Sequence, residues 1–286
     1  MRRPRVLVTH RQVQPVALAL LQRECDVIVP DVDFPTRAHI LDLCPGIDGL
    51  LWTNYKMKLD REILDAAGSR LKTVSLTMNG VDCVDLFELA ERHISLGHTP
   101  HIPNEAVADL AIGLMLTVSC GMFRPSEIAA GTEPPIKGST VGIVGFGGIG
   151  ELITKRLQGF EVKTLLYCGR NVKENASKFN AQLVAKEELL RRSDYVFVAC
   201  PLTSDTFRMF NREAFAIMKP TAALINVARG AIVDEMALVN ALKTGQIRAA
   251  ALDTVTTEPL PADSELCQLP NCGIHTVAYN FPSTLG

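Results

Sequence analysis

Short apolar runs alternate with amphipathic stretches along most of the chain. The runs are rich in Val, Ile and Leu, as in Arg5–Thr9 and Tyr195–Val198. The stretches between them place apolar residues at the spacing of a helix face, as in Pro15–Arg23 and Glu235–Thr244. Apolar strands that alternate with helices are typical of a parallel sheet covered by helices on both faces.

The alternation falls into two blocks, which predict two domains. Residues 1–100 contain the first block, with strands expected at 5–9, 25–29, 49–52, 71–75 and 94–96. Residues 101–275 contain the second block, which begins with an expected helix and continues after a Gly- and Pro-rich connector at 131–140. About six strands are expected there, among them 141–144, 162–167, 195–198, 222–226 and 249–252. The sequence therefore predicts an α/β fold of two doubly wound, Rossmann-like parallel sheets.

Composition and charge narrow the class of function. Of the 286 residues, 47% are hydrophobic and 21% are charged, which is the composition of a globular protein. The formal net charge of −2 provides no basic surface for nucleic acid or for an anionic membrane. The apolar stretch 106–123 contains Asp109 and is shorter than the ~20 residues that span a bilayer, so we expect a buried helix there. We expect a small-molecule site, with neither nucleic acid nor membrane as a partner.

The eight cysteines are scattered along the chain without a CxxC pair. In a chain of this length, scattered cysteines are typical of small buried apolar residues rather than of metal ligands or disulfides. We therefore expect a reduced, cytoplasmic protein without a metal site.

A glycine-rich turn follows the apolar run 141–144. Its GxGxxG spacing lies between an apolar run and a stretch of helical periodicity, the context that a dinucleotide-binding turn requires. The first glycine permits the tight turn, the second lets the backbone approach a pyrophosphate, and the third allows close packing of helix on strand. A plain strand–helix turn is the alternative. The expected cofactor-binding residues are Gly145, Gly147, Gly148, Ile149 and Gly150.

The next expected strand ends in Leu166-Tyr-Cys-Gly-Arg170. In an NAD site, an Asp or Glu about 20 residues beyond the glycines binds the ribose hydroxyls, and this chain has neither at that point. Gly169 leaves room there, and Arg170 offers a guanidinium that suits a 2′-phosphate. We therefore expect NADP(H) as the preferred cofactor, with NAD(H) as the alternative. A solvated surface residue is the alternative for Arg170.

Three further segments follow the turn in a specific order. They are Ala199-Cys-Pro-Leu-Thr-Ser-Asp-Thr206, Ile225-Asn-Val-Ala-Arg-Gly-Ala-Ile-Val-Asp234 and Ala251-Leu-Asp-Thr-Val-Thr-Thr-Glu-Pro-Leu260. With them, the chain resembles the D-isomer-specific 2-hydroxyacid dehydrogenases from about residue 4 to about residue 275, and among these it is most similar to the animal glyoxylate/hydroxypyruvate reductases. The resemblance implies a coenzyme domain inserted into a flavodoxin-like substrate domain, with 276–286 as a truncated return segment to the first domain.

The resemblance also implies roles for individual residues. Arg229 matches the substrate arginine, which holds the carboxylate and polarises the carbonyl. Burying an arginine in an apolar run is costly without an anionic partner, so a structural salt bridge is its alternative. Asp253 matches a residue at the nicotinamide end, and Glu258 matches the carboxylate that pairs with the catalytic histidine and raises its pKa. Further residues lie in segments that line the cofactor: Pro201, Thr206 and Val227.

The chain departs from the family pattern at the proton donor. Family members end a strand in Pro-His-Ile-Gly, whose histidine is the general acid, and counting from Asn271-Cys272 places Val277 at that position. His275 lies two residues earlier, ~6.6 Å away on a regular strand. Either a register shift lets His275 act as the donor, or His275 is a structural or exposed residue and the donor is missing.

Two other segments differ from the family as well. The substrate-carboxylate loop, Ser-Val-Gly-Ile-Asp in relatives, is Met78-Asn-Gly-Val-Asp82 here, with Asn79 and Gly80 as the expected substrate-binding residues. The connector at 124–140 lacks the longer arm through which relatives form dimers. A homodimer with a shortened arm is therefore what the resemblance implies.

The resemblance implies an NADPH-dependent reductase that converts 2-keto acids such as glyoxylate and hydroxypyruvate to D-2-hydroxy acids. Because Val277 replaces the general acid, an impaired enzyme is expected, since losing such a group costs roughly 10²–10⁴-fold in rate. The alternative is a non-catalytic NADP(H)-binding paralogue that keeps the cofactor domain and has lost turnover.

Overall fold

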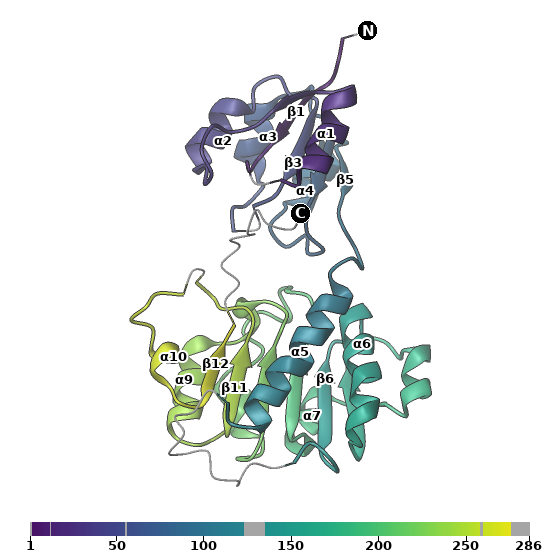
Figure 1. The fold of residues 1–286 in the computed structure, drawn as a ribbon, viewed down its shortest axis with the longest axis vertical. Coiled ribbons are helices and arrows are strands. Elements are labelled where there is room, and N and C mark those ends of the chain that lie inside the picture. The colour runs from purple at the N-terminus through teal and green to yellow at the C-terminus, as the bar shows by residue number, and fades with distance from the viewer. Residues whose placement is uncertain (1, 12, 55, 123–134, 258–259, 276–286) are drawn as a thin grey trace. The chain divides into compact units, whose positions relative to one another are not determined.

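The computed structural model describes residues 2–11, 13–54, 56–122, 135–257 and 260–275. The chain divides into two compact units, Met1–Pro103 and Asn104–Gly286 (Figure 1). Each unit contains one parallel sheet with helices packed around it. The described helices include none that is both long enough and apolar enough to cross a membrane.

The first unit has a five-stranded sheet in the order β2-β1-β3-β4-β5. Each of its neighbouring strand pairs is parallel. This order is that of flavodoxin-like folds. The strands are β1 (Arg5–Val8), β2 (Asp26–Ile28), β3 (Gly49–Trp52), β4 (Thr73–Leu76) and β5 (Ser95–Gly97), and the helices are α1 (Pro15–Glu24), α2 (Arg37–Leu43), α3 (Arg61–Ala67) and α4 (Leu86–Glu91).

The second unit has a seven-stranded sheet in the order β12-β11-β10-β9-β6-β7-β8. Its strands are β6 (Thr140–Val144), β7 (Thr164–Cys168), β8 (Gln182–Leu183), β9 (Tyr195–Val198), β10 (Ala223–Asn226), β11 (Ala249–Leu252) and β12 (Cys272–Ile274). Its helices are α5 (Asn104–Ser119), α6 (Gly148–Leu157), α7 (Lys186–Arg192), α8 (Arg212–Ala216), α9 (Glu235–Lys243) and α10 (Glu265–Gln268), with short 3-10 turns η1 (Gln158–Phe160), η2 (Glu174–Phe179) and η3 (Gly230–Ile232).

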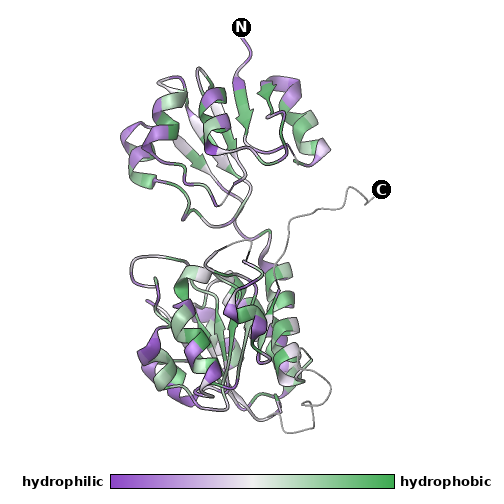
Figure 2. Ribbon diagram, turned by 90° about the vertical axis from the view of Figure 1, so that its left-hand side faces the viewer, coloured by the Kyte–Doolittle hydropathy of each residue, from purple (hydrophilic) through white to green (hydrophobic). Residues whose placement is uncertain are grey.

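The central strands of the second sheet are buried on both faces, which explains their unbroken apolar sequence. Along β9, Val196 and Val198 lie in one hydrophobic cluster, whereas Phe197, which points to the opposite face, lies in the other. Figure 2 shows the same arrangement as hydrophobic strands enclosed by helices with hydrophilic outer faces. The predicted fold class, an α/β protein with two doubly wound parallel sheets, is confirmed.

Short elements of the second unit, β8, α8 and α10 among them, had no counterpart among the predicted elements. The edge strand β8 has two residues, both exposed, so it leaves no apolar run in the sequence. The sheet therefore has seven strands where six were expected. The five-residue helix α8 is too short to show helical periodicity, although Asn211 caps it by accepting a hydrogen bond from the Ala214 amide.

Counted from β6, the strands of this sheet follow the order 3-2-1-4-5-6-7, starting at the β8 edge. The order reverses between β6 and β9, which pair in parallel from Val141 with Tyr195 to Val144 with Val198. In doubly wound sheets, ligands bind beyond the carboxyl ends of the strands at such a point.

Candidate functional site

The carboxyl edge of the second sheet carries most of the residues that the sequence singles out. They follow β6, β7, β9, β10, β11 and β12, whose carboxyl ends meet at one edge because all the strands are parallel. Figure 1 shows β6, β11 and β12 running in the same direction in this unit. The residues at this edge are Gly145, Gly147, Gly148, Ile149, Gly150, Gly169, Arg170, Pro201, Thr206, Val227, Arg229, Asp253 and His275.

Two of the glycines in the turn after β6 are required by close packing. Gly145 has a φ of +97°, and a Cβ on it would lie 2.6 Å from the Cα of Cys200. A Cβ on Gly150 would lie 2.3 Å from the carbonyl oxygen of Gly145. Real Cβ atoms do not approach backbone this closely, so a side chain at either position would force the turn apart.

Gly147 differs from these two glycines, because a Cβ on it would meet nothing within 4 Å. It is exposed and precedes α6, whose first N–H groups have no acceptor within the helix. Bare N–H groups at a helix N-terminus, with open space in front of them, form an anion site. The residues present therefore fit the pyrophosphate of a dinucleotide.

The loop after β7 lies beside this turn, since the Gly145 amide donates a hydrogen bond to the Cys168 carbonyl at 3.0 Å. Its far end is fixed by Tyr167, whose hydroxyl accepts a hydrogen bond of 3.1 Å from the Lys173 amide. Between these two anchors, Gly169 and Arg170 are both exposed. A guanidinium is thus available next to the turn, at a point where the sequence has no carboxylate.

The loop after β9 is a compact turn held by Thr206. Its Oγ1 donates to the carbonyl oxygen of Pro201 at 2.7 Å and accepts from the amide of Thr203 at 2.8 Å. The loop starts at Cys200, whose backbone packs against Gly145. Burial raises the pKa of the Cys168 and Cys200 thiols to about 11, so both are neutral at physiological pH.

The loop after β10 holds Arg229 through a buried amide. The fully buried Asn226 donates from Nδ2 to the Arg229 carbonyl and accepts at Oδ1 from the Ala228 amide, both at 3.0 Å. The Arg229 side chain is half-buried. The Val227 side chain is packed into the core, so its main chain is the part that can face a ligand.

Asn226 and Gly230 are two residues of this loop that the sequence interpretation missed. A Cβ on Gly230 would lie 2.0 Å from the carbonyl carbon of Val255, so the loops after β10 and β11 touch at this glycine. The available signal was an amide at the end of an apolar run, followed four residues later by glycine. An unsatisfied amide in that position would be costly, which makes a structural partner for Asn226 necessary.

The loop after β11 begins with Asp253, whose amide donates to the Asn226 carbonyl at 2.9 Å. Its Oδ1 lies 3.0 Å from Nδ1 of His275, which directly follows β12. The Asp253 side chain is 15% exposed and the His275 side chain 46% exposed. The predicted structural or exposed histidine therefore has a specific acidic partner at the site edge.

In the first unit, Asn79 and Gly80 follow β4 and are half-buried. The Asn79 carbonyl lies 3.0 Å from Nδ1 of His98, and the Met78 carbonyl accepts from the Thr99 amide at 3.2 Å. The loop is thus braced against the segment that follows β5. Its role in substrate binding stays a prediction.

Several predicted features lie outside the described residues. They are Glu258, Val277, the return segment 276–286 and most of the shortened arm, at 123–134.

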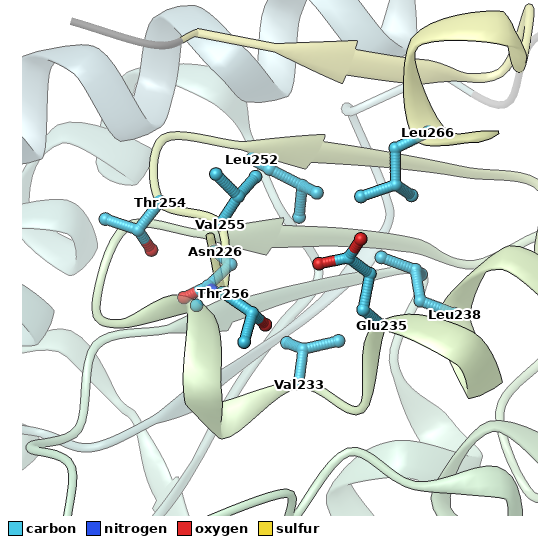
Figure 3. A pocket seen from close by; sticks show the side chains of 10 residues that line it. Asn226, Val233, Glu235, Leu238, Leu252, Thr254, Val255, Thr256 and Leu266 are labelled. Atoms are coloured by element: carbon cyan, nitrogen blue, oxygen red, sulfur yellow. The ribbon is translucent and has the colours of Figure 1, made fainter. Parts of the chain in front are cut away.

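A small pocket lies between β10, β11, α9 and α10 (Figure 3). Glu235 points into it among Leu238, Leu252 and Leu266. Its volume of about 10 Å³ is far below the ~300–1,000 Å³ of typical ligand sites, and the pocket includes neither the glycine turn nor Arg229. We therefore place the candidate site at the open sheet edge and not in this pocket.

Comparison with known proteins gives the same family. The profile of the D-isomer specific 2-hydroxyacid dehydrogenase NAD binding domain matches residues 123–276. The human glyoxylate reductase/hydroxypyruvate reductase is 38% identical over 94% of this chain and 86% of its own length. The glyoxylate reductase of Thermofilum pendens is 38% identical over 95% and 84%.

Solved structures are similar over the whole fold. A glyoxylate reductase from Paecilomyes thermophila has a TM-score of 0.85 and 27% identity, covering 98% of this chain and 90% of its own. The matched family profile covers more than half of the chain, and curated relatives match it almost throughout. The chain belongs to the D-isomer specific 2-hydroxyacid dehydrogenases, a family of oxidoreductases with a nicotinamide-dinucleotide-binding domain.

Proposed function

We propose that this protein reduces small 2-keto acids, glyoxylate and hydroxypyruvate among them, to D-2-hydroxy acids with NADPH. The single observation that carries the proposal is the likeness to reductases so named over 94% of the chain. The sheet edge supports it, because a glycine turn that fits a pyrophosphate and a half-buried arginine occur together there.

NADP(H) is proposed over NAD(H) because of the loop after β7. An exposed Arg170 follows β7 next to the turn, and residues 166–173 include no carboxylate to bind ribose hydroxyls. A guanidinium forms paired, charge-assisted hydrogen bonds to a phosphate. The cofactor residues proposed for the rest of the dinucleotide are Gly145, Gly147, Gly148, Ile149, Gly150, Gly169, Pro201, Thr206, Val227 and Asp253.

Arg229 is the residue we propose for the keto acid. Its guanidinium would pair with the substrate carboxylate and draw electron density from the carbonyl, while Asn226 fixes its main chain. The bound nicotinamide supplies the hydride. Asn79 and Gly80 are proposed to hold the substrate carboxylate as well, and Glu258 to assist the proton donor.

The sequence position of the general acid favours a slow enzyme, because Val277 cannot donate a proton. The second candidate function, a non-catalytic NADP(H)-binding protein, rests on the same residue. Purified protein with NADPH and either keto acid should consume NADPH above an enzyme-free blank, yet below the ~10 s⁻¹ median of enzymes. Binding of NADPH without any consumption would overturn the reductase and favour the second candidate.

We also propose a cytoplasmic location and a homodimer with a short arm. The scattered cysteines support the first, since such thiols stay reduced there. The family resemblance supports the second. Light scattering of the purified protein measures its mass directly, and a mass near 31.2 kDa would contradict the dimer.

A further inference from the structure

His275 and Asp253 form an acid–base pair at the proposed site, and the preceding function gives His275 no role and Asp253 only a place in the cofactor site. We propose that His275 is the proton donor of this protein and that Asp253 is its positioning residue. The inference rests on the proposed keto-acid reductase, since a donor needs a reaction to serve. The sequence predicts that the general acid is missing, because Val277 stands at its position. Under this proposal the general acid is present two residues earlier, at His275.

The choice of donor follows first from the sequence. Reduction of a keto acid leaves an alkoxide, which needs a group that can carry a proton near neutral pH, and histidine is the side chain suited to that. The six histidines are His10, His39, His93, His98, His101 and His275. His275 is therefore the one histidine in the sequence of the second unit. It directly follows β12, at the same carboxyl edge of the sheet as the glycine turn.

Main-chain hydrogen bonds place this imidazole in one framework with Arg229. The His275 amide donates to the Leu252 carbonyl at 2.8 Å, and the next residue, Asp253, donates its amide to the Asn226 carbonyl at 2.9 Å. Asn226 in turn donates its side-chain amide to the Arg229 carbonyl at 3.0 Å. The backbones of His275 and Arg229 are thus tied to the neighbouring strands β12, β11 and β10. The sheet therefore sets the distance between these two backbones.

The contact with Asp253 also fixes which nitrogen of His275 acts. Nδ1 lies 3.0 Å from the carboxylate, which can only accept, so we assign the proton of this contact to Nδ1 and the transferred proton to Nε2. Asp253 is mostly buried, whereas almost half of the His275 side chain is exposed. Of the other charged groups named at this edge, Arg170 follows β7, Arg229 follows β10, and Glu258 lies outside the described residues.

The proton balance of the step is complete with these groups. As the keto carbon receives the hydride, the electron pair of the carbonyl π bond moves to oxygen, and this oxygen takes the proton from Nε2. His275 is left neutral and regains a proton from water, to which it is exposed. The Asp253 carboxylate, 3.0 Å from Nδ1, would stabilise the charged imidazole without taking part in the transfer.

The central test compares His275→Gln with His39→Gln. Glutamine at 275 keeps a polar side chain and cannot donate a proton, so kcat with glyoxylate should fall roughly 10²–10⁴-fold while the Kd for NADPH stays unchanged. In the first unit, Thr36 caps α2 and the His39 side chain completes the capping box. Glutamine suits that position as well, so His39→Gln should behave as the unchanged protein.

A pH profile separates a donor from a structural residue. Reduction needs a protonated donor, so kcat of the unchanged protein should fall on the alkaline side of its pH profile, and this limb should vanish in His275→Gln. If the variant merely loosened the fold, the whole profile would drop with its shape kept, which would overturn the proposal.

A measurement without turnover tests the pair itself. Nitrogen NMR of the neutral imidazole should show the Nδ1–H tautomer in the unchanged protein, and Asp253→Asn should shift it towards Nε2–H. An Nε2–H tautomer in the unchanged protein would overturn the assigned geometry.

The outcomes distinguish the two proposals. NADPH consumption that persists unchanged in His275→Gln would overturn the donor and leave the reductase in place. No consumption by the unchanged protein would overturn both. Activity that appears only with Val277→His would restore the reductase scaffold and exclude His275 as its donor.

Discussion

The glycine turn after β6 and the acid–base end at β11 and β12 lie on one sheet edge, yet they differ in how they resist change. In the turn, Gly145 and Gly150 are enclosed by backbone atoms at 2.6 and 2.3 Å from where a Cβ would stand. At the other end, His275 and Asp253 meet through side chains, and His275 is 46% exposed. The glycine positions of the turn are fixed by backbone packing. A proton donor is a side chain, so a residue near the family's donor position can take its role.

The comparison explains why one chain can keep the full family pattern in the turn and depart from it at the donor. A substitution in the turn disturbs both the fold and ligand binding. A substitution at an exposed strand end disturbs chemistry alone, since little packing depends on it. The predictions that follow separate these two kinds of site.

The largest effect is expected at Arg229. Arg229→Gln removes the proposed cation for the keto acid, so kcat/KM should fall roughly 10³-fold while the Kd for NADPH stays the same. Steady-state kinetics and cofactor fluorescence measure the two quantities. Arg191→Gln, at an exposed position on α7, is the matched control. Equal loss of NADPH affinity in Arg229→Gln would mean that Arg229 serves the cofactor domain instead.

The next effect separates two glycines of the same turn. Gly145→Ala should lower the free energy of unfolding by about 2–5 kcal/mol, because it combines a positive φ with a backbone clash. Gly147→Ala should change it by less than about 1 kcal/mol, since a Cβ there meets nothing within 4 Å, yet it should weaken NADPH binding roughly tenfold or more.

Urea unfolding and fluorescence titration report these two quantities side by side. Equal stability losses in both variants would contradict the distinction between a packed and a ligand-facing glycine.

A smaller effect is expected at Arg170. Arg170→Ala should raise the Kd for NADPH roughly tenfold and leave the Kd for NADH unchanged, because the lost contact is to the 2′-phosphate alone. Added salt should narrow the difference between the unchanged protein and the variant. Parallel loss for both cofactors would assign Arg170 to a general phosphate contact.

The smallest effect concerns pH and the thiols beside the turn. Burial raises the pKa of Cys168 and Cys200 from the usual 9.0 to about 11, so the folded state keeps protons that the unfolded state releases. Their contribution is complete below about pH 9 and is lost as the pH rises towards about 11. Between about pH 9 and pH 9.5, unfolding should become easier by about 1 kcal/mol on this account.

The double variant Cys168→Ala, Cys200→Ala should show a flatter dependence on pH in the same urea experiment. An unchanged slope would assign the alkaline loss to other groups.

The sequence predicted two kinds of feature: the strands and helices, which show a periodic pattern of apolar residues, and the glycine positions, which steric limits require. The doubly wound fold followed from periodicity, because many residues report the same strand or helix. The turn followed from Gly145, Gly147 and Gly150, whose spacing reflects steric limits. The two-residue β8 was missed, because its residues are exposed and form no apolar run.

The contacts across loops could not be read from the sequence. Asn226 supports Arg229 from three residues away, and His275 meets Asp253 across 22 residues. The second contact depends on which strands become neighbours, and periodicity carries no information on either contact. Gly230 was missed for the same reason, since its close contact is with Val255 on the adjacent loop.

β12 is an outer strand of its sheet, and its recorded partner among the described strands is β11. The hydrogen bonds of a strand that is paired on one side can open locally, while those of β9 and β10, which have neighbours on both sides, stay closed. In deuterium exchange, the amide of His275 should therefore exchange through fraying of the strand end, well before the amides of β10. Substitutions at this end of the strand therefore affect the stability of the remaining sheet little, so a catalytic residue can change position here at a small cost in folding free energy.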